Sequence, residues 1–166
     1  MVVLASAFHD WILALHIIAV VVAFGVLFIY PLMGFVGARL DPPAMASFHR
    51  FQSAIHNRVQ APGLAVVVAA GIYLASDLHV WGEFFVAWGL AASIVIGGIG
   101  GAYISPREKR LVALAESEVA AAPVGVGAGS FAWSDEYRTV ARQASFARLV
   151  QLAITVVTIL FMSLHL

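Results

Sequence analysis

The chain has 166 residues, of which 62% are hydrophobic and 11% charged, and its formal net charge at pH 7 is zero. This composition is typical of a single membrane domain spanning residues 1–166 and argues against a soluble enzyme or a nucleic-acid-binding protein. Because the sequence contains no cysteine, disulfides, thiolate nucleophiles and cysteine-ligated zinc or iron–sulfur sites are excluded.

The first long apolar stretch covers residues 11–38, WILALHIIAVVVAFGVLFIYPLMGFVGA, and contains no acidic or basic residue. A helix rises about 1.5 Å per residue and crosses the ~30 Å hydrocarbon core of a bilayer in about 20 residues. A soluble helix does not need to be apolar on every side over such a length. The stretch therefore predicts a transmembrane helix, with His16 inside it.

A polar turn with two prolines follows, and residues 44–59, AMASFHRFQSAIHNRV, have the pattern of an amphipathic helix. We expect this helix to continue into a second span over residues 60–76. Proline removes a backbone donor and disturbs a helix interior. Pro62 is therefore expected to kink or break the helix.

A short connection at residues 77–80 leads to a third apolar span over 81–104, WGEFFVAWGLAASIVIGGIGGAYI. The following polar region, 105–145, is predicted to begin with a short amphipathic helix. Its Gly/Ala-rich middle, 121–130, is predicted to be mobile. A last helix leads into a fourth span over 146–166.

All nine basic residues lie in or beside the two long connections, 39–59 and 105–145. The positive-inside rule therefore places both connections in the cytoplasm and both termini outside. The expected fold is all-α, an integral membrane four-helix antiparallel bundle. We expect a multi-pass protein of the bacterial inner membrane, with the lipid bilayer as its first partner.

Small residues recur every fourth position along the third span, at Gly89, Ser93, Gly97 and Gly101. Such a stripe lets another helix approach closely, either within the chain or in a homo-oligomer. A similar stripe on the second span consists of Ala61, Ala65 and Ala69.

The fourth span carries polar side chains and a methionine on one face, which we expect to point into the bundle because lipid offers no hydrogen bonds. These residues are Gln151, Thr155, Thr158 and Met162.

His16 is the first candidate functional residue, because an ionisable side chain inside a span is uncommon. A neutral imidazole is a good ligand for haem or for a metal. Its helical face, with Val20, Ala23, Leu27 and Tyr30, could line a porphyrin. The alternative is a histidine that hydrogen-bonds to a neighbouring helix.

His56 and Arg58 lie where the second span enters the membrane, next to Asn57 and Gln60. Arg58 is suited to pair with a haem propionate or a lipid headgroup, and a solvated interfacial patch is the alternative. At ~1.5 Å per residue, His16 and His56 differ in height by roughly 20 Å, so they cannot share one haem. His49 is expected to face the cytoplasmic interface.

A second candidate site lies at the outer end of the bundle, where His9, His79, Glu83 and His165 are predicted to converge. Mixed histidine and carboxylate ligands suit zinc or copper. The alternative is that these residues are ordinary solvated loop ends.

Three short features resemble those of a broad group of small bacterial four-helix membrane proteins: a Leu-His pair ending at His16, a Pro-Gly pair beginning at Pro62, and a third span opening at Trp81. The group includes the HemJ-type protoporphyrinogen oxidases, the CopD-type copper-resistance domains and an uncharacterised set of integral membrane proteins. The resemblance covers roughly residues 10–100 and implies a haem-linked role for His16. HemJ-type proteins also need a lysine early in the third span, where this sequence has only Glu83, so the uncharacterised set fits best.

The sequence therefore predicts a b-type haem protein that uses His16 for electron transfer or porphyrin handling. The alternatives are an outer-face zinc or copper protein and a non-catalytic assembly subunit that packs through its glycine stripe. The sequence contains no nucleophile constellation, phosphate loop or dinucleotide fingerprint, and it does not decide whether the protein is an enzyme.

Overall fold

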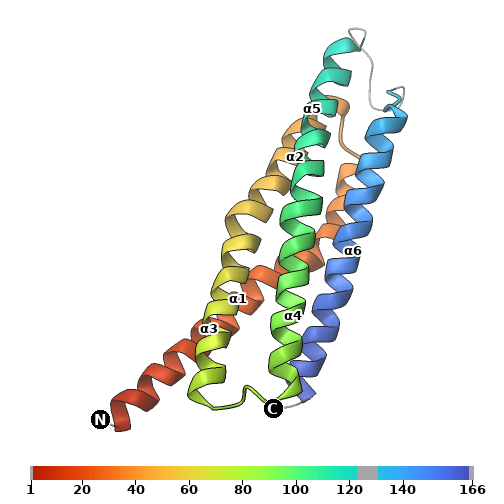
Figure 1. Ribbon diagram of the computed structural model, residues 1–166. Coiled ribbons are helices and arrows are strands. Elements are labelled where there is room, and N and C mark those ends of the chain that lie inside the picture. Colours follow the sequence, from red (N-terminus) through yellow and green to blue (C-terminus); the bar gives the residue numbers. More distant parts are fainter. Residues whose placement is uncertain (1, 123–130, 165–166) are drawn as a thin grey trace.

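The computed structural model describes residues 2–122 and 131–164, and these described residues form helices and connecting turns without a strand (Figure 1). Most of the predicted Gly/Ala-rich segment, and His165, lie outside the described residues. The elements in chain order are α1 (Val2–Gly37), α2 (Pro42–Ile55), the π-helical turn η1 (His56–Gln60), α3 (Ala61–Asp77), α4 (Phe84–Gly98), the π-helical turn η2 (Ile99–Ile104), α5 (Ser105–Ala121) and α6 (Asp135–Leu164).

Four helical stretches are long and apolar enough to cross a membrane, which confirms the predicted number of membrane helices. They are Ala7–Gly37, Pro42–Asp77, Phe84–Ala121 and Asp135–Leu164. The second and third stretches are longer than the predicted spans, because the polar helices α2 and α5 run directly into the apolar helices α3 and α4. The third helix begins at Phe84 rather than at Trp81, and Glu83 is its N-cap residue.

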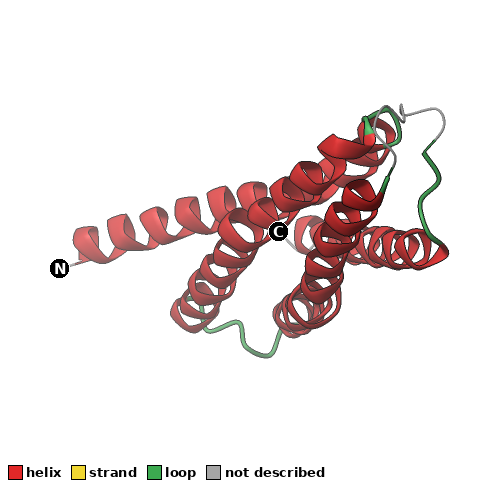
Figure 2. Ribbon diagram, turned by 90° about the horizontal axis from the view of Figure 1, so that it is seen from above, coloured by secondary structure: helices red, strands yellow, loops and turns green. Residues whose placement is uncertain are grey.

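Successive long helices pass up and down through the molecule (Figure 1). The helix pairs that pack most extensively are α1 with α3, α2 with α5, and α4 with α6. The N-terminal part of α1 projects beyond the other long helices (Figure 2). Large apolar side chains on the outside of the bundle are exposed, among them Ile17 (54%), Val21 (65%) and Leu32 (62%). Such an apolar exterior is suited to lipid.

Each of the two composite helices contains a π-helical turn just before a proline. In η1 the N–H of Ala61 donates to the carbonyl of His56, and in η2 the N–H of Ser105 donates to the carbonyl of Gly100. A proline ring clashes with the carbonyl four residues earlier, and for Pro62 that carbonyl lies within η1. The wider turn accommodates the ring, so the predicted disturbance at Pro62 is a π-helical turn in a continuous helix.

Two apolar clusters form the core. The first packs α1 against α3, α4 and α6 around Ala23, Leu27 and Ile96. The second joins α2, α5 and α6 around Leu111 and Ala144. Each cluster lies within one half of the bundle's length, and the polar residues described below lie along the same interior.

The polar face of α6 points into the bundle, as predicted. Gln151, Thr155 and Thr158 are at most 7% exposed, and the Met162 side chain occupies the space where a Cβ on Gly89 would lie. The α6 helix therefore packs its hydrogen-bonding groups against protein rather than lipid.

The glycine stripe of α4 and η2 does not lie on one packed face. Gly89 and Ser93 are buried, whereas Gly97 and Gly101 are exposed and Gly100 occupies the buried position. At 3.6 residues per turn, a four-residue step overshoots a full turn by about 40°, so a stripe with this spacing rotates away from its partner helix. Whether the exposed glycines join copies of the chain stays a prediction.

Candidate functional site

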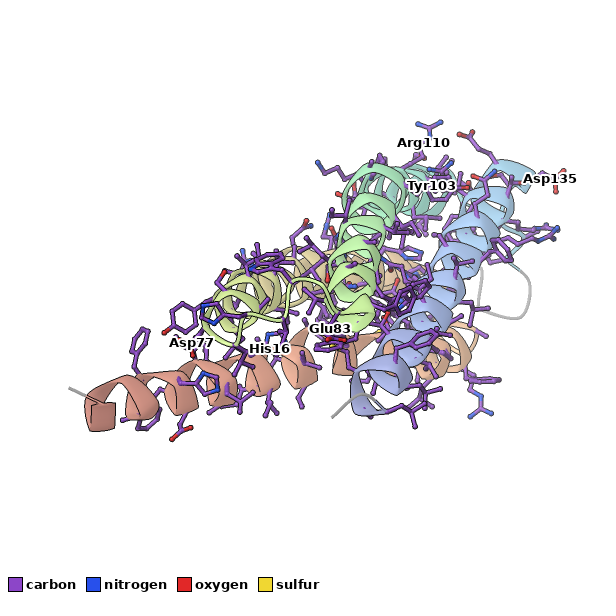
Figure 3. All side chains as sticks on the ribbon, turned by 60° about the horizontal axis from the view of Figure 1, so that its bottom comes forward. His16, Asp77, Glu83, Tyr103, Arg110 and Asp135 are labelled. Carbon is purple, nitrogen blue, oxygen red and sulfur yellow. The ribbon has the colours of Figure 1, made fainter. Side chains whose placement is uncertain are left out.

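His16 lies on the side of α1 that faces α3 (Figure 3). Its Nδ1 is 3.1 Å from the carbonyl oxygen of Val67, and because a carbonyl only accepts, Nδ1 carries the proton and donates it. The ring fits against Gly71, where an added Cβ would lie 3.2 Å from Cε1. His16 thus hydrogen-bonds to a neighbouring helix, which is the alternative that the sequence left open, and its Nε2 has no hydrogen-bond partner among the described residues.

The helical face that His16 shares with Ala23 and Leu27 is filled by protein. Ala23 is 0% exposed and Leu27 1% exposed. A Cβ added to Gly63 of α3 would lie 2.9 Å from the Ala23 Cβ, so the two helices touch at this point. Protein side chains therefore occupy this face at Ala23 and Leu27.

His56 is the buried histidine with an unused ring nitrogen, at 5% exposure. Its Nδ1 lies 2.9 Å from Oε1 of Gln60, an acceptor, so Nδ1–H donates and Nε2 keeps its lone pair. Nε2 makes no hydrogen bond within the part of the chain that the structure describes. The ring fits against Gly100, whose added Cβ would lie 3.2 Å from Nε2. The two π-helical turns therefore meet at His56 and Gly100.

An apolar groove of about 570 Å³ extends from His56 along α3 and α4. We call it the α3–α4 groove. Polar residues close one end of the groove, and small or aliphatic residues line the rest of it. His56, Asn57 and Gln60 lie at this end, Ser93 lies further along α4, and the apolar residues include Ala61, Leu64, Ala65, Val68, Ala69, Ile94, Gly97 and Gly101. The alanine stripe of α3 and three members of the α4 stripe, Ser93, Gly97 and Gly101, thus line this groove.

Arg58 does not join the groove. Its side chain is exposed, and it makes no hydrogen bond or ion pair with any described residue. Residues two apart on a helix do not face each other, so Arg58 points away from the side that His56 lines, and Asn57 lines the groove instead. His16 contacts α3 at Val67, eleven residues beyond His56, which corresponds to roughly 16 Å along the helix. The two histidines therefore lie at separate sites.

Further polar groups lie next to the His56 ring. The Nε2 of Gln151 donates to the carbonyl of Ile96 at 2.8 Å. The Gln151 Oε1 and the Thr155 Oγ1 are buried without a partner in the described structure. The amide of Gln151 also approaches the Gly100 Cβ position, at 3.2 Å. A buried row of hydrogen-bonding groups therefore runs along α6 beside His56.

At the predicted outer end, Asp77 contacts both His9 and His79. The Nδ1 of His9 lies 2.6 Å from the Asp77 carboxylate, and the Nδ1 of His79, which has a positive φ of 57°, lies 3.0 Å from the Asp77 carbonyl. Glu83 lies on the nearby turn, where it precedes α4 (Figure 3). Among residues 2–122 and 131–164, no three His, Cys, Asp or Glu residues are grouped so that they could hold a metal ion.

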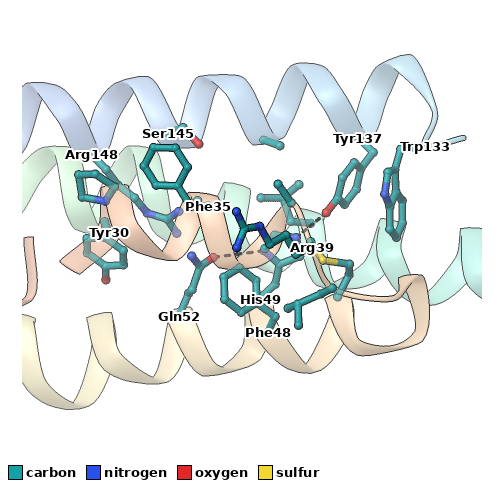
Figure 4. Close-up of a pocket in the computed structure, with 18 of the residues that line it drawn as sticks. Tyr30, Phe35, Arg39, Phe48, His49, Gln52, Trp133, Tyr137, Ser145 and Arg148 are labelled. Carbon is teal, nitrogen blue, oxygen red and sulfur yellow. Dashed lines mark hydrogen bonds between the residues drawn. The ribbon is translucent and has the colours of Figure 1, made fainter. Parts of the chain in front are cut away.

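A larger cavity, of about 800 Å³, lies where the end of α1 meets α2 and the start of α6 (Figure 4). We call it the arginine cavity. Its polar lining includes Arg39, His49, Gln52, Tyr137 and Arg148. Sequence reasoning did not identify this site. Two features of the sequence could have indicated the cavity. Arg148 lies three residues before Gln151 on the polar face of α6, and Gln52 lies four residues before His56.

His49 is buried, with 5% exposure, rather than facing the interface as expected. Its Nδ1 lies 3.3 Å from the Gln52 Oε1 and its Nε2 lies 2.8 Å from the Tyr137 hydroxyl (Figure 4). The amide oxygen only accepts, so Nδ1 donates to it and Nε2 accepts from the hydroxyl. Because both ring nitrogens are engaged, His49 holds α2 against α6 and is not free to bind a metal.

Arg148 and Glu108 form a buried ion pair between α6 and α5. The Arg148 Nη2 lies 2.6 Å from the Glu108 Oε1, and the Glu108 side chain is 0% exposed. The Arg148 Nε and the Glu108 Oε2 are buried without partners in the described structure. The Tyr30 ring lies 4.6 Å from the Arg148 guanidinium carbon (Figure 4). The pair therefore neutralises Arg148, and the Arg148 Nε remains a buried donor without a partner in the described structure.

Comparison with protein-family models, with curated proteins and with solved structures finds no match to this chain. The resemblance to the HemJ-type and CopD-type group therefore stays a prediction. The geometry of the two cavities and of the five described histidines carries the functional proposal.

Proposed function

We propose that this protein binds a b-type haem in the α3–α4 groove, with His56 as an axial ligand. The observation that carries the proposal is the hydrogen bond from the His56 Nδ1 to Gln60. Histidines that bind a metal commonly donate their other ring N–H to an oxygen, which fixes the tautomer and the orientation of the ring. His56 is held in this state beside an apolar groove.

The groove suits a flat apolar ligand. Its volume of about 570 Å³ falls within the range of small-molecule sites. Alanine and glycine side chains let a planar ring approach the backbone of both helices closely, and Asn57 and Gln60 offer hydrogen bonds at the polar end. A bound haem would supply one-electron redox chemistry, whereas the chain itself supplies the ligand, its orientation and the exclusion of water.

His16 is the alternative ligand, at a separate site. Its Nδ1–H is held by the Val67 carbonyl, which leaves Nε2 in the ligating form. The packed contact of Ala23 with Gly63 fills the face beside it. His56 is therefore the first candidate haem ligand and His16 the second.

Visible absorption spectra of the detergent-purified protein, expressed with ample haem and recorded oxidised and reduced, test this proposal. The wild type and His16→Ala are expected to show a Soret band, and His56→Ala is expected to lose or shift it. A colourless wild type would reject haem binding. A band lost only in His16→Ala would move the site to α1 and overturn the assignment to His56.

The second candidate function is zinc or copper binding at the outer end by His9, His79, Glu83 and His165. It is favoured by the two histidines that Asp77 holds through their Nδ1 atoms. Unchanged zinc or copper affinity after replacement of all four predicted ligands by alanine would reject it. An assembly role through Gly97 and Gly101 is the third candidate, since both glycines are exposed.

The membrane orientation is part of the same proposal: a bacterial inner membrane, an antiparallel bundle and both termini outside. Its support is the concentration of charge at one end of the bundle. Ion pairs join Arg50 to Glu116 and Arg110 to Glu136 there. Cysteine-accessibility labelling at Ser76 and at Ser117 tests the orientation, with the outer label expected at Ser76.

A further inference from the structure

The arginine cavity combines a polar inner end with an apolar mouth. The inner end contains Arg148, which is only 8% exposed and whose Nε has no partner in the described structure. At the mouth, Phe35 and Leu149 are 71% and 52% exposed. The cavity lies where the apolar part of α1 gives way to Arg39, which is the level of a membrane interface in a chain that spans the bilayer. The lining is therefore suited to an amphiphile rather than to a soluble metabolite.

The unused polar groups of the cavity are mainly donors. The Gln52 Nε2 has only the Met33 sulfur as a partner, at 3.9 Å, and sulfur is a weak acceptor. The Tyr30 hydroxyl makes no hydrogen bond with a described residue. Together with the buried Arg148 Nε, these donors favour a ligand that carries acceptor oxygens.

The charge of the lining also favours an anion. Glu108 compensates Arg148, whereas the guanidinium of Arg39 has no ion-pair partner in the part of the chain that the structure describes. No acidic side chain is among the described residues that line the cavity. The lining therefore carries one uncompensated positive charge, and basic pockets between membrane helices at the interface bind anionic headgroups.

We propose that the arginine cavity binds a phospholipid with a singly charged anionic headgroup, whose phosphate lies between Arg39 and Arg148 and whose chains lie along Phe35 and Leu149. Trp133 and Tyr137, stacked with ring centroids 4.1 Å apart, lie at the end of the cavity away from Arg148, beyond Arg39 (Figure 4). Aromatic rings of this kind are favoured at the headgroup level of a membrane. This site is separate from the α3–α4 groove and does not depend on haem.

The test uses the full-length protein in detergent micelles and native mass spectrometry with palmitoyl-oleoyl phosphatidylglycerol. Phosphatidylcholine with the same chains has no net charge and tests whether binding needs an anionic headgroup. Oleate tests whether the bound anion is a fatty-acid carboxylate rather than a phosphate. The variant Arg39→Gln removes the uncompensated charge. Its matched control is Arg142→Gln, which changes an exposed arginine of α6 that does not line the cavity.

A second variant, Gly34→Leu, adds a bulky side chain to the lining of the cavity. A Cβ added at Gly34 meets nothing within 4 Å, and Gly34 lines the cavity. Thermal unfolding of this variant checks that it is folded.

We expect phosphatidylglycerol to bind more tightly than phosphatidylcholine and than oleate. Loss of one arginine at a headgroup is expected to weaken its binding about five-fold, and Gly34→Leu is expected to abolish it, with Arg142→Gln unchanged. Equal binding of the two phospholipids, or equal effects of Arg39→Gln and Arg142→Gln, would overturn the proposal. Tighter binding of oleate that Gly34→Leu removes would assign the cavity to a fatty acid instead.

Discussion

The contact between the two π-helical turns makes a prediction that does not depend on any ligand. A Cβ added at Gly100 would lie 2.5 Å from the His56 Cε1 and 3.2 Å from Nε2 and from the Gln151 amide nitrogen. The imidazole cannot swing away freely, because Gln60 holds its Nδ1. Gly100→Ala must therefore move a hydrogen-bonded ring or separate η1 from η2.

The size of the effect follows from two opposing terms. Overpacking a tight interior costs about 1–3 kcal/mol, whereas alanine is favoured over glycine in a helix by up to ~1 kcal/mol. Gly98→Ala is the matched control, since an added Cβ at Gly98 meets nothing within 4 Å. Both variants share the helix-propensity gain, so their difference isolates the overpacking term.

The assay is thermal unfolding of both variants in the same detergent. A chain of this size shifts its Tm by roughly 2–4 °C per kcal/mol, so Gly100→Ala should melt about 2–12 °C below Gly98→Ala. It should also lose haem affinity if His56 is the ligand. Equal melting temperatures of the two variants would refute the reasoning, because the π-helical turns would then not be in contact.

Three further predictions test single contacts. Gln60→Leu removes the hydrogen bond that orients the His56 ring and should lower haem affinity about 10- to 100-fold in a haem titration. Unchanged affinity would show that this hydrogen bond does not support haem binding. Glu108→Gln leaves Arg148 buried and uncompensated and should cost about 3–5 kcal/mol in unfolding free energy. Glu136→Gln, which breaks an exposed pair, should cost no more than ~1 kcal/mol, and similar losses in both variants would contradict this difference. If the exposed glycines form an interface between copies of the chain, Gly97→Leu should disrupt the homo-oligomer in size-exclusion chromatography with light scattering, and an oligomer that survives would rule out this stripe as the interface.

The two cavities are connected through one continuous helix. Gln52 lines the arginine cavity and His56 lines the α3–α4 groove, and the two residues are one turn apart. A lipid in the first cavity would therefore contact the same helix that orients the proposed haem ligand. The buried polar row of α6 begins at Arg148 in the arginine cavity, and its Gln151 approaches the Gly100 position beside His56.

The sequence by itself determined the four long apolar helices and the buried polar face of α6. These features are local, because apolar length decides whether a helix can lie in a membrane and residue spacing decides which side chains share a helical face. The sequence also identified His16, His56, His9 and His79 as candidates, since ionisable residues are few in an apolar chain.

The tertiary structure decided which of these side chains have a free atom and space beside it. Gln60 fixes the tautomer of His56, the contact of Ala23 with Gly63 fills the face beside His16, and Tyr137 occupies the second nitrogen of His49. The arginine cavity likewise arises only where α1, α2 and α6 meet, and the drift of a four-residue stripe around a helix put Gly100 rather than Gly101 in the packed position. The contacts of Ala23 with Gly63 and of His49 with Tyr137, like the arginine cavity, join residues far apart in the chain, which spacing along a single helix does not contain.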